Sequence, residues 1–439
     1  MNSTPKKSHL SQSVLVGGAI AATATLYLFG PAWCRSVRAA LEDSPKNVVD
    51  EVWQIVNREY VDGTFNQVDW QATRQQLLSK NYTSREEAYT AVRAALEKLG
   101  DPYTRFMDPT QYQALTSQTS GELSGVGIRL EVNEKTKKIA VVEPIENSPA
   151  FKAGVKPGDE LRAIDGKSTE GMTLEQASAK IRGEVGKPVT LQLARAGKGV
   201  FDLTVTRAQI ELPTVRYSIK QEGQLRVGYI RLNEFSSHAA TQMNRAIKDL
   251  SKQNVNAFVL DMRGNPGGLL NASVDIARMW MDNGAIVRTV DRQGSNEEFK
   301  ANQTSITKLP LAVLVDGNSA SASEILTGAL KDNRRATVIG SQTFGKALVQ
   351  SVHPLSDGSG LAVTIAHYYT PNGIDIGHKG VTPDVKIDLN DDQRKYLASN
   401  PTLIATQNDP QYARAINFLE STHLAQPGTR QTVSPLSSR

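Results

Sequence analysis

The apolar positions after residue 47 recur at intervals of three and four, the spacing that places them on one face of a helix. A second helical stretch begins at Ser84, where Ser-x-x-Glu is typical of a capping box, and it ends at Gly100. These patterns predict a helical N-terminal region over residues 41–120.

From Gly121 the pattern changes to short β-branched runs separated by glycines, with one helical stretch at residues 174–181. The predicted strands cover residues 127–132, 139–142, 160–164 and 189–193. Short strands gathered around a single helix predict a compact module over residues 121–208.

Beyond the module, near-continuous apolar runs of the kind found in doubly covered sheets alternate with helical patterns. The predicted strands are residues 226–231, 257–260, 312–315 and 337–339, and the predicted helices are residues 238–250, 272–281 and 323–331. We therefore expect an α/β core over residues 209–390. The fold class is α/β (α+β) multidomain, with the module inserted between the helical region and the core.

The C-terminal part, residues 391–439, has one well-marked helix start. Asp409 suits the N-cap position and Pro410 the first helical position. The Ser/Thr/Pro-rich end after Gln426 predicts a disordered tail.

At the N-terminus, residues 14–33 carry no charge, and lysines and arginines flank them on both sides. This pattern is typical of a cleavable secretory signal, but the run is also long enough for a retained membrane anchor or a buried helix. We assign residues 1–40 to a signal peptide or membrane anchor. Export and possible membrane association follow from either.

The amino-acid composition excludes several kinds of binding and catalytic site. A net charge of +5 over 439 residues, without a dense basic run, argues against a nucleic-acid partner. The single Cys34 excludes a cysteine-based zinc site, and the six histidines show no HExxH spacing. We expect no metal and no cofactor, so the chemistry must depend on other side chains.

The most unusual cluster is Ser319-Ala-Ser321-Ala-Ser323-Glu324, which leaves a predicted strand and opens a helix. Serines at a helix start are most often caps, and Ser321-x-x-Glu324 is a capping box in its own right. A second segment, residues 340–347, turns on two glycines around Lys346.

Two interpretations of Lys346 compete. In the first, residues 340–346 form a GxxxxGK phosphate loop, with Asp261 as the magnesium-binding acid. Ala347 has no hydroxyl for magnesium, and residues 348–352 look like a strand where a phosphate loop needs a helix. In the second, Lys346 is the general base for a serine, which requires burial to lower its pKa.

The serine and lysine segments closely resemble the carboxyl-terminal processing peptidases, or tail-specific proteases, and the likeness covers nearly the whole mature chain. The resemblance implies Ser321 as nucleophile, Lys346 as base 25 residues later, and Gln350 as the residue that holds the lysine amine. One departure is Ala347, where most members have glycine.

The oxyanion hole needs two backbone N–H groups. Ala322, directly after the nucleophile at a helix N-terminus, can supply one. The resemblance implies Gly267, in the Asn-Pro-Gly-Gly turn, as the other; by itself this turn could equally be a plain strand-to-helix connection.

The module resembles a PDZ domain. Gly125, Val126, Gly127 and Ile128 occupy the place of a loop that binds a terminal carboxylate, although such a loop is often only a turn. In some family members an arginine at the position of Arg182 couples the module to the active site, and a solvated surface cation is the alternative.

We therefore expect a serine endopeptidase that binds the free C-terminal tails of protein substrates on its PDZ module and cleaves them. The likeness is strongest to members from oxygenic phototrophs, one of which trims a photosystem II reaction-centre precursor. This implies the periplasm or thylakoid lumen. A catalytically silent PDZ scaffold that only binds tails is the alternative.

Overall fold

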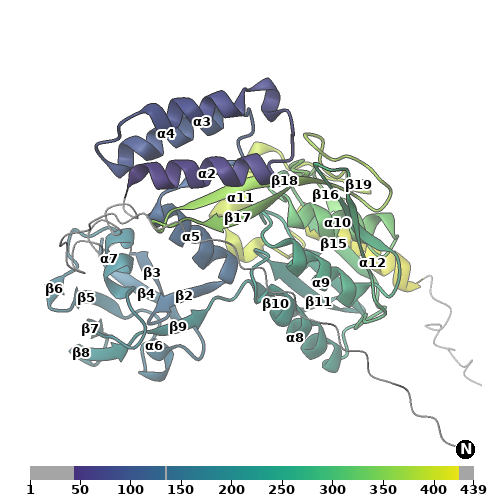
Figure 1. Ribbon diagram of the computed structural model, residues 1–439. Helices are drawn as coiled ribbons and strands as arrows, with labels where there is room; N and C mark the ends of the chain where they lie inside the picture. Colours follow the sequence, from purple (N-terminus) through teal and green to yellow (C-terminus); the bar gives the residue numbers. More distant parts are fainter. Residues whose placement is uncertain (1–43, 134–135, 425–439) are drawn as a thin grey trace, which may run out of the picture.

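A computed structural model describes residues 44–133 and 136–424 (Figure 1). The predicted signal or anchor and the predicted disordered tail lie outside these residues. Within them, no helix is both long enough and apolar enough to cross a membrane.

The N-terminal region is helical, as predicted, and three of its helices, one of them not predicted, lie together on one side of the molecule (Figure 1). They are α2 (Pro45–Glu59), α3 (Trp70–Ser79) and α4 (Arg85–Glu97), and a short 3-10 turn, η1 (Phe65–Gln67), precedes α3. The predicted spacing buries Val49, Val52 and Val56 against α4 and against Leu361 and Val363 of a neighbouring sheet. This contact attaches the helical region to the core.

A six-stranded sheet forms the centre of the core, and its strand order is β10-β11-β12-β15-β16-β19. The strands are β10 (Val215–Glu222), β11 (Leu225–Leu232), β12 (Ala257–Asp261), β15 (Leu311–Val315), β16 (Thr337–Gly340) and β19 (Val385–Lys386). Only the β10–β11 pair is antiparallel among these pairs. The four predicted strands of the core are confirmed.

Helices cover both faces of this sheet, which explains the continuous apolar runs. Helices α8 (Ala239–Lys252), α9 (Leu270–Trp280) and α10 (Ala322–Asp332) pack on one face. Helix α12 (Pro410–Leu424) packs on the other, after α11 (Asp391–Ser399) and the short η2 (Pro401–Leu403).

A second, antiparallel sheet was not predicted apart from the strand at residues 348–352. It contains β1 (Arg105–Met107), β18 (Gly360–Tyr369), β13 (Ala285–Asp291), β14 (Asn296–Lys300) and β17 (Leu348–Pro354). Its strands come from distant parts of the chain. Strand β18 pairs with β17, which follows Lys346, and with β1, which follows Gly100, so it links these two segments.

The module has the predicted strands and helix. It contains β3 (Ile128–Val132), β4 (Ile139–Pro144), β5 (Glu160–Ile164), β6 (Lys167–Ser168), β7 (Pro188–Arg195) and β8 (Gly199–Thr206), with α6 (Pro149–Lys152) and α7 (Leu174–Ile181). A two-stranded ribbon, β2 (Glu122–Gly125) with β9 (Ala208–Glu211), joins it to the core, and α5 (Pro109–Ser120) leads into the ribbon.

Candidate active site

Ser321 stands between β15 and the first residue of α10, in a backbone conformation that few residues adopt. Its φ is 54° and its ψ is −114°. Positive φ is unfavourable for a residue with a Cβ, and such strain is retained where the surroundings fix it. The surroundings include Gly267, where an added Cβ would lie 2.9 Å from the Ser321 Cβ and 2.7 Å from the Ala320 carbonyl oxygen. The serine is therefore held by close backbone packing.

Glu324 connects the serine segment to the lysine segment, a role that sequence reasoning missed because it treated this residue only as a cap. Its buried carboxylate accepts hydrogen bonds from the N–H groups of Ser321, Gly345 and Lys346, at 2.9, 2.6 and 2.9 Å. The Thr343 hydroxyl donates a fourth, at 2.6 Å. Burial raises the pKa of Glu324, and these hydrogen bonds oppose that rise. The four donors fix both segments to one group.

Lys346 is largely removed from water. Burial lowers the pKa of its ammonium, the Arg105 charge lowers it further, and the carboxylates of Asp101 and Glu324 oppose the shift. Its Nζ lies 4.7 Å from the centroid of the Tyr103 ring, a cation–π contact. The predicted environment for a basic lysine is present.

The catalytic candidates lie around one cavity of about 240 Å³. Ser321, Ala322, Lys346 and Gln350 all line it, together with Gly268 of the neighbouring turn. Within the described residues, the Lys346 ammonium makes no hydrogen bond to Ser321 or Gln350. The fold thus brings the predicted residues to one place and leaves the final contact between serine and lysine unmade.

A tyrosine that sequence reasoning did not single out also joins the two segments. The hydroxyl of Tyr368 donates toward the carbonyl oxygens of Ser321, at 3.1 Å, and of Lys346. Tyr368 is 1% exposed, and its strand, β18, pairs with the strand that follows Lys346. Only the tertiary pairing could reveal this contact.

Gln350 has a different partner from the one that the resemblance implies. Its Nε2 donates to the hydroxyl oxygen of Thr364 at 3.4 Å, and the Thr364 hydroxyl donates to Asp101 Oδ2 at 2.6 Å. Asp101 also accepts from the Tyr103 N–H at 2.9 Å. The glutamine therefore connects to the residues around the lysine rather than to the lysine itself.

The two backbone donors of the expected oxyanion hole differ in their partners. Within the described chain, the Ala322 N–H donates to no other group. The Gly267 N–H donates to Asn265 Oδ1 at 2.9 Å. The carbonyl oxygen of Asn265 in turn accepts from the Ala320 N–H at 3.1 Å and the Ser323 hydroxyl at 3.0 Å. Asn265 therefore positions the turn against the serine.

In the module, the predicted carboxylate loop runs from Gly125, the end of β2, through buried Val126 and Gly127 to Ile128, the start of β3. Gly127 has φ 79°, and a Cβ there would lie 2.3 Å from the Ser148 Cβ. Strand β3 is an edge strand of its sheet and lies next to α7. An edge strand beside a helix can accept an extended peptide.

Arg182 is exposed at the end of α7, and its side chain makes no hydrogen bond to any residue of the described ranges. A different arginine, Arg207, makes the hydrogen bonds at the C-terminal end of α7. It donates to the carbonyl oxygens of Ile181, Pro188 and Lys180 at 2.8, 2.9 and 2.9 Å. A cation there suits the negative end of the helix dipole.

The phosphate-loop interpretation is wrong. Lys346 is followed by strand β17, whereas the residues of a phosphate loop lead directly into a helix. Asp261, its proposed magnesium ligand, is 0% exposed and already paired with two arginines.

Comparison with known proteins finds proteases and a PDZ domain, which agrees with a protease active site in this cavity. Residues 226–387 match peptidase family S41, and residues 141–195 match a PDZ domain. The chain is 45% identical to the carboxyl-terminal-processing protease of Synechocystis sp. over 76% of this chain and 78% of that protein. It is 42% identical to that of Picosynechococcus sp. over 89% and 92%.

A solved structure, the photosystem II D1 C-terminal processing protease, covers 79% of this chain with a TM-score of 0.51 and 39% identity, over 93% of its own length. The fold, the two matched domains and the relatives all agree. The chain belongs to the carboxyl-terminal-processing proteases of peptidase family S41.

Proposed function

We propose that this protease cleaves its protein substrates through an acyl-enzyme on Ser321, with Lys346 as general base and then general acid. The observation that carries this proposal is the shared cavity, which brings a strained serine at a helix N-terminus to a lysine whose pKa burial lowers. A neutral amine can accept the serine proton, as histidine does in other serine hydrolases.

The proposed reaction proceeds by acylation of Ser321 and then hydrolysis of the resulting ester. Neutral Lys346 takes the hydroxyl proton of Ser321 while Oγ attacks the scissile carbonyl carbon, and the N–H groups of Ala322 and Gly267 stabilise the oxyanion. The Lys346 ammonium then gives its proton to the leaving amine, and the peptide C–N bond breaks. A water attacks the ester with Lys346 again as base, which releases the new C-terminus and restores the Ser321 hydroxyl.

Two contacts must change for this reaction. The Gly267 N–H has to turn from Asn265 Oδ1 toward the oxyanion, and the Lys346 amine has to move from the Tyr103 ring toward Ser321. Hydrogen bonds of catalytic groups are often long or poorly aligned without substrate. We therefore propose that the structure represents a resting arrangement that substrate binding completes.

For substrate recognition, we propose that the loop Gly125-Val126-Gly127-Ile128 binds the terminal carboxylate and that the tail adds to the free edge of β3. We also propose that Arg182, which is exposed at the end of α7, couples binding of a tail on the module to the active site in the core. The likeness to the D1 processing protease supports a photosystem II reaction-centre precursor as substrate. The uncharged run at residues 14–33 supports export to the periplasm or thylakoid lumen.

The test is cleavage of a protein that ends in the precursor tail, with a free or an amidated C-terminus. We expect cleavage of the free tail only. Ser321→Ala and Lys346→Ala should each abolish it, whereas Ser341→Ala, in the same loop as the lysine, should not. Tail binding without any cleavage by the wild-type protein would instead favour the silent scaffold.

A further inference from the structure

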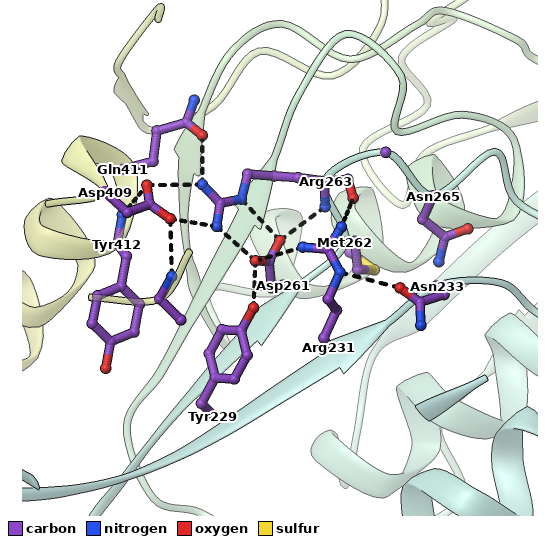
Figure 2. Close-up of polar contacts among 12 residues, drawn as sticks. Tyr229, Arg231, Asn233, Asp261, Met262, Arg263, Asn265, Asp409, Gln411 and Tyr412 are labelled. Atoms are coloured by element: carbon purple, nitrogen blue, oxygen red, sulfur yellow. Dashed lines mark hydrogen bonds and ion pairs between the residues drawn. The ribbon is translucent and has the colours of Figure 1, made fainter. Parts of the chain in front are cut away.

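The carboxyl end of β12 carries a dense buried ion-pair network, and Figure 2 shows Arg263 at its centre. All five N–H groups of the guanidinium are used. They donate twice to Asp261, at 2.9 and 2.7 Å, twice to Asp409, at 2.9 and 2.8 Å, and once to Gln411, at 3.0 Å. A lysine could not reproduce this planar fork.

The network is buried, so its geometry is tightly determined. Asp261 and Asp409 are 0% exposed, and Arg263 is 9% exposed. Burial alone would raise the pKa of Asp261, but the charge and hydrogen bonds of Arg263, with Arg231, hold it below its usual range. Direct pairing with Arg263 thus fixes the positions of both carboxylates.

The network joins two parts of the chain that are 146 residues apart. Asp409 directly precedes α12 and also accepts from the N–H groups of Ala405, at 3.2 Å, and Tyr412, at 3.3 Å. Helix α12 packs on the sheet face opposite α10. The C-terminal helix is therefore fixed to the end of β12.

Residues 264–268, which we call the oxyanion turn, follow Arg263 directly. The turn has three glycines with φ of 72°, 104° and 138°, and its buried Asn265 side chain donates to the Leu232 carbonyl oxygen at 2.9 Å. Its first residue, Gly264, donates to Asp316 at 2.9 Å, and Arg231 binds the Arg263 carbonyl oxygen at 3.2 Å. The contacts at the start of the turn, together with those of Asn265, thus set its position.

We propose that Arg263, held by Asp261 and Asp409, is a positioning residue for the oxyanion turn, so that α12 contributes to catalysis from the far face of the sheet. This inference rests on the proposed use of the Gly267 N–H in the oxyanion hole. Its effect is on the tetrahedral intermediate and not on tail capture, because the module is a separate element.

The experiment compares Arg263→Lys and Asp409→Asn with Arg335→Lys in the full chain. Arg335 is a matched control, because it is partly buried and donates to the carbonyl oxygens of Trp280, Thr307 and Leu309. It precedes β16 and so lies at the amino ends of the parallel strands, whereas Arg263 follows the carboxyl end of β12. For each variant, kcat and KM are corrected for the folded fraction. Binding of a peptide aldehyde is also measured, since it adds the Ser321 hydroxyl across its carbonyl and places an oxygen in the hole.

We expect Arg263→Lys to lower kcat about 10-fold or more and to weaken aldehyde binding by a similar factor, with KM within about 2-fold of the wild type. Asp409→Asn should act in the same direction, and Arg335→Lys should leave both unchanged. Unchanged kcat per folded molecule in the two network variants would overturn the proposal. If Arg263→Lys does not fold, Asp409→Asn decides alone. Failure of the wild-type protein to cleave would instead contradict the proposed function.

Discussion

The carboxylate of Glu324 accepts a hydrogen bond from the backbone N–H of Lys346 at 2.9 Å, although the two residues are 22 positions apart and the rest of α10 and strand β16 lie between them. The same Oε2 atom accepts from the Ser321 N–H at 2.9 Å. One buried oxygen thus fixes the nucleophile and the base at a common point.

Replacing that carboxylate by an amide tests its role. Glu324→Gln turns one oxygen into an N–H donor that faces two donors, so we expect a loss of about 3 kcal/mol in the free energy of unfolding. We also expect kcat to fall about 100-fold, because both catalytic segments lose their anchor. Urea unfolding and steady-state kinetics measure the two effects. Glu87→Gln, an exposed glutamate that accepts from the Thr83 N–H, is the control and should change neither.

The dependence of kcat/KM on pH should follow the titration of Lys346. Because burial lowers its pKa, kcat/KM should rise with pH through a midpoint below the usual lysine value of about 10.4. Below that midpoint the buried ammonium destabilises the fold. Lys346→Met should therefore stabilise the protein most at pH values below the folded pKa, with a gain that declines as pH rises toward the unfolded value. A midpoint at or above the ordinary lysine value would contradict this account.

Two neighbours of Lys346 should move that midpoint in opposite directions. Arg105→Gln removes a cation that lowers the lysine pKa, so the midpoint should rise. Asp101→Asn removes an anion that raises it, so the midpoint should fall. The kcat/KM profile of each variant against pH makes the comparison, and shifts of the same sign in both would show that the profile does not titrate Lys346.

Tail capture should be separable from cleavage in the module. Gly127→Ala places a Cβ 2.3 Å from the Ser148 Cβ at a φ of 79°, so the loop must move. We expect weaker binding of a free-carboxylate tail peptide and a higher KM, with the thermal stability of the core unchanged. Gly197→Ala, a module glycine with φ 75° and open space around it, is the control for backbone strain alone. Equal losses in both variants would argue against a specific role for the loop.

Sequence periodicity predicted the helices and strands in which buried positions follow a regular apolar spacing along the chain. The helix at residues 174–181 and the strand at residues 160–164 match α7 and β5 to the residue. The second sheet was missed because its strands, such as β13 and β14, are only partly buried and mix polar with apolar positions. Its pairing is decided by tertiary contacts.

In the candidate site, too, some residues could be predicted from the sequence and others depend on tertiary contacts. Ser321 and Lys346 were predicted because their two segments resemble those of the carboxyl-terminal processing peptidases, and the fold places both residues at one cavity. Glu324 was visible only as a cap, since its bonds to residues 343–346 depend on how two loops meet. The pairing of Arg263 with Asp409 joins residues 146 positions apart, and no local pattern signals it.

The central claim is that Ser321 is the nucleophile and that Lys346 activates it. Treatment of the full chain with a fluorophosphonate, followed by peptide mass mapping, tests it directly. We expect one adduct, on Ser321, formed at least 100-fold more slowly in Lys346→Ala and absent in Ser321→Ala. An adduct on another serine, or equal labelling rates with and without the Lys346 amine, would contradict the account.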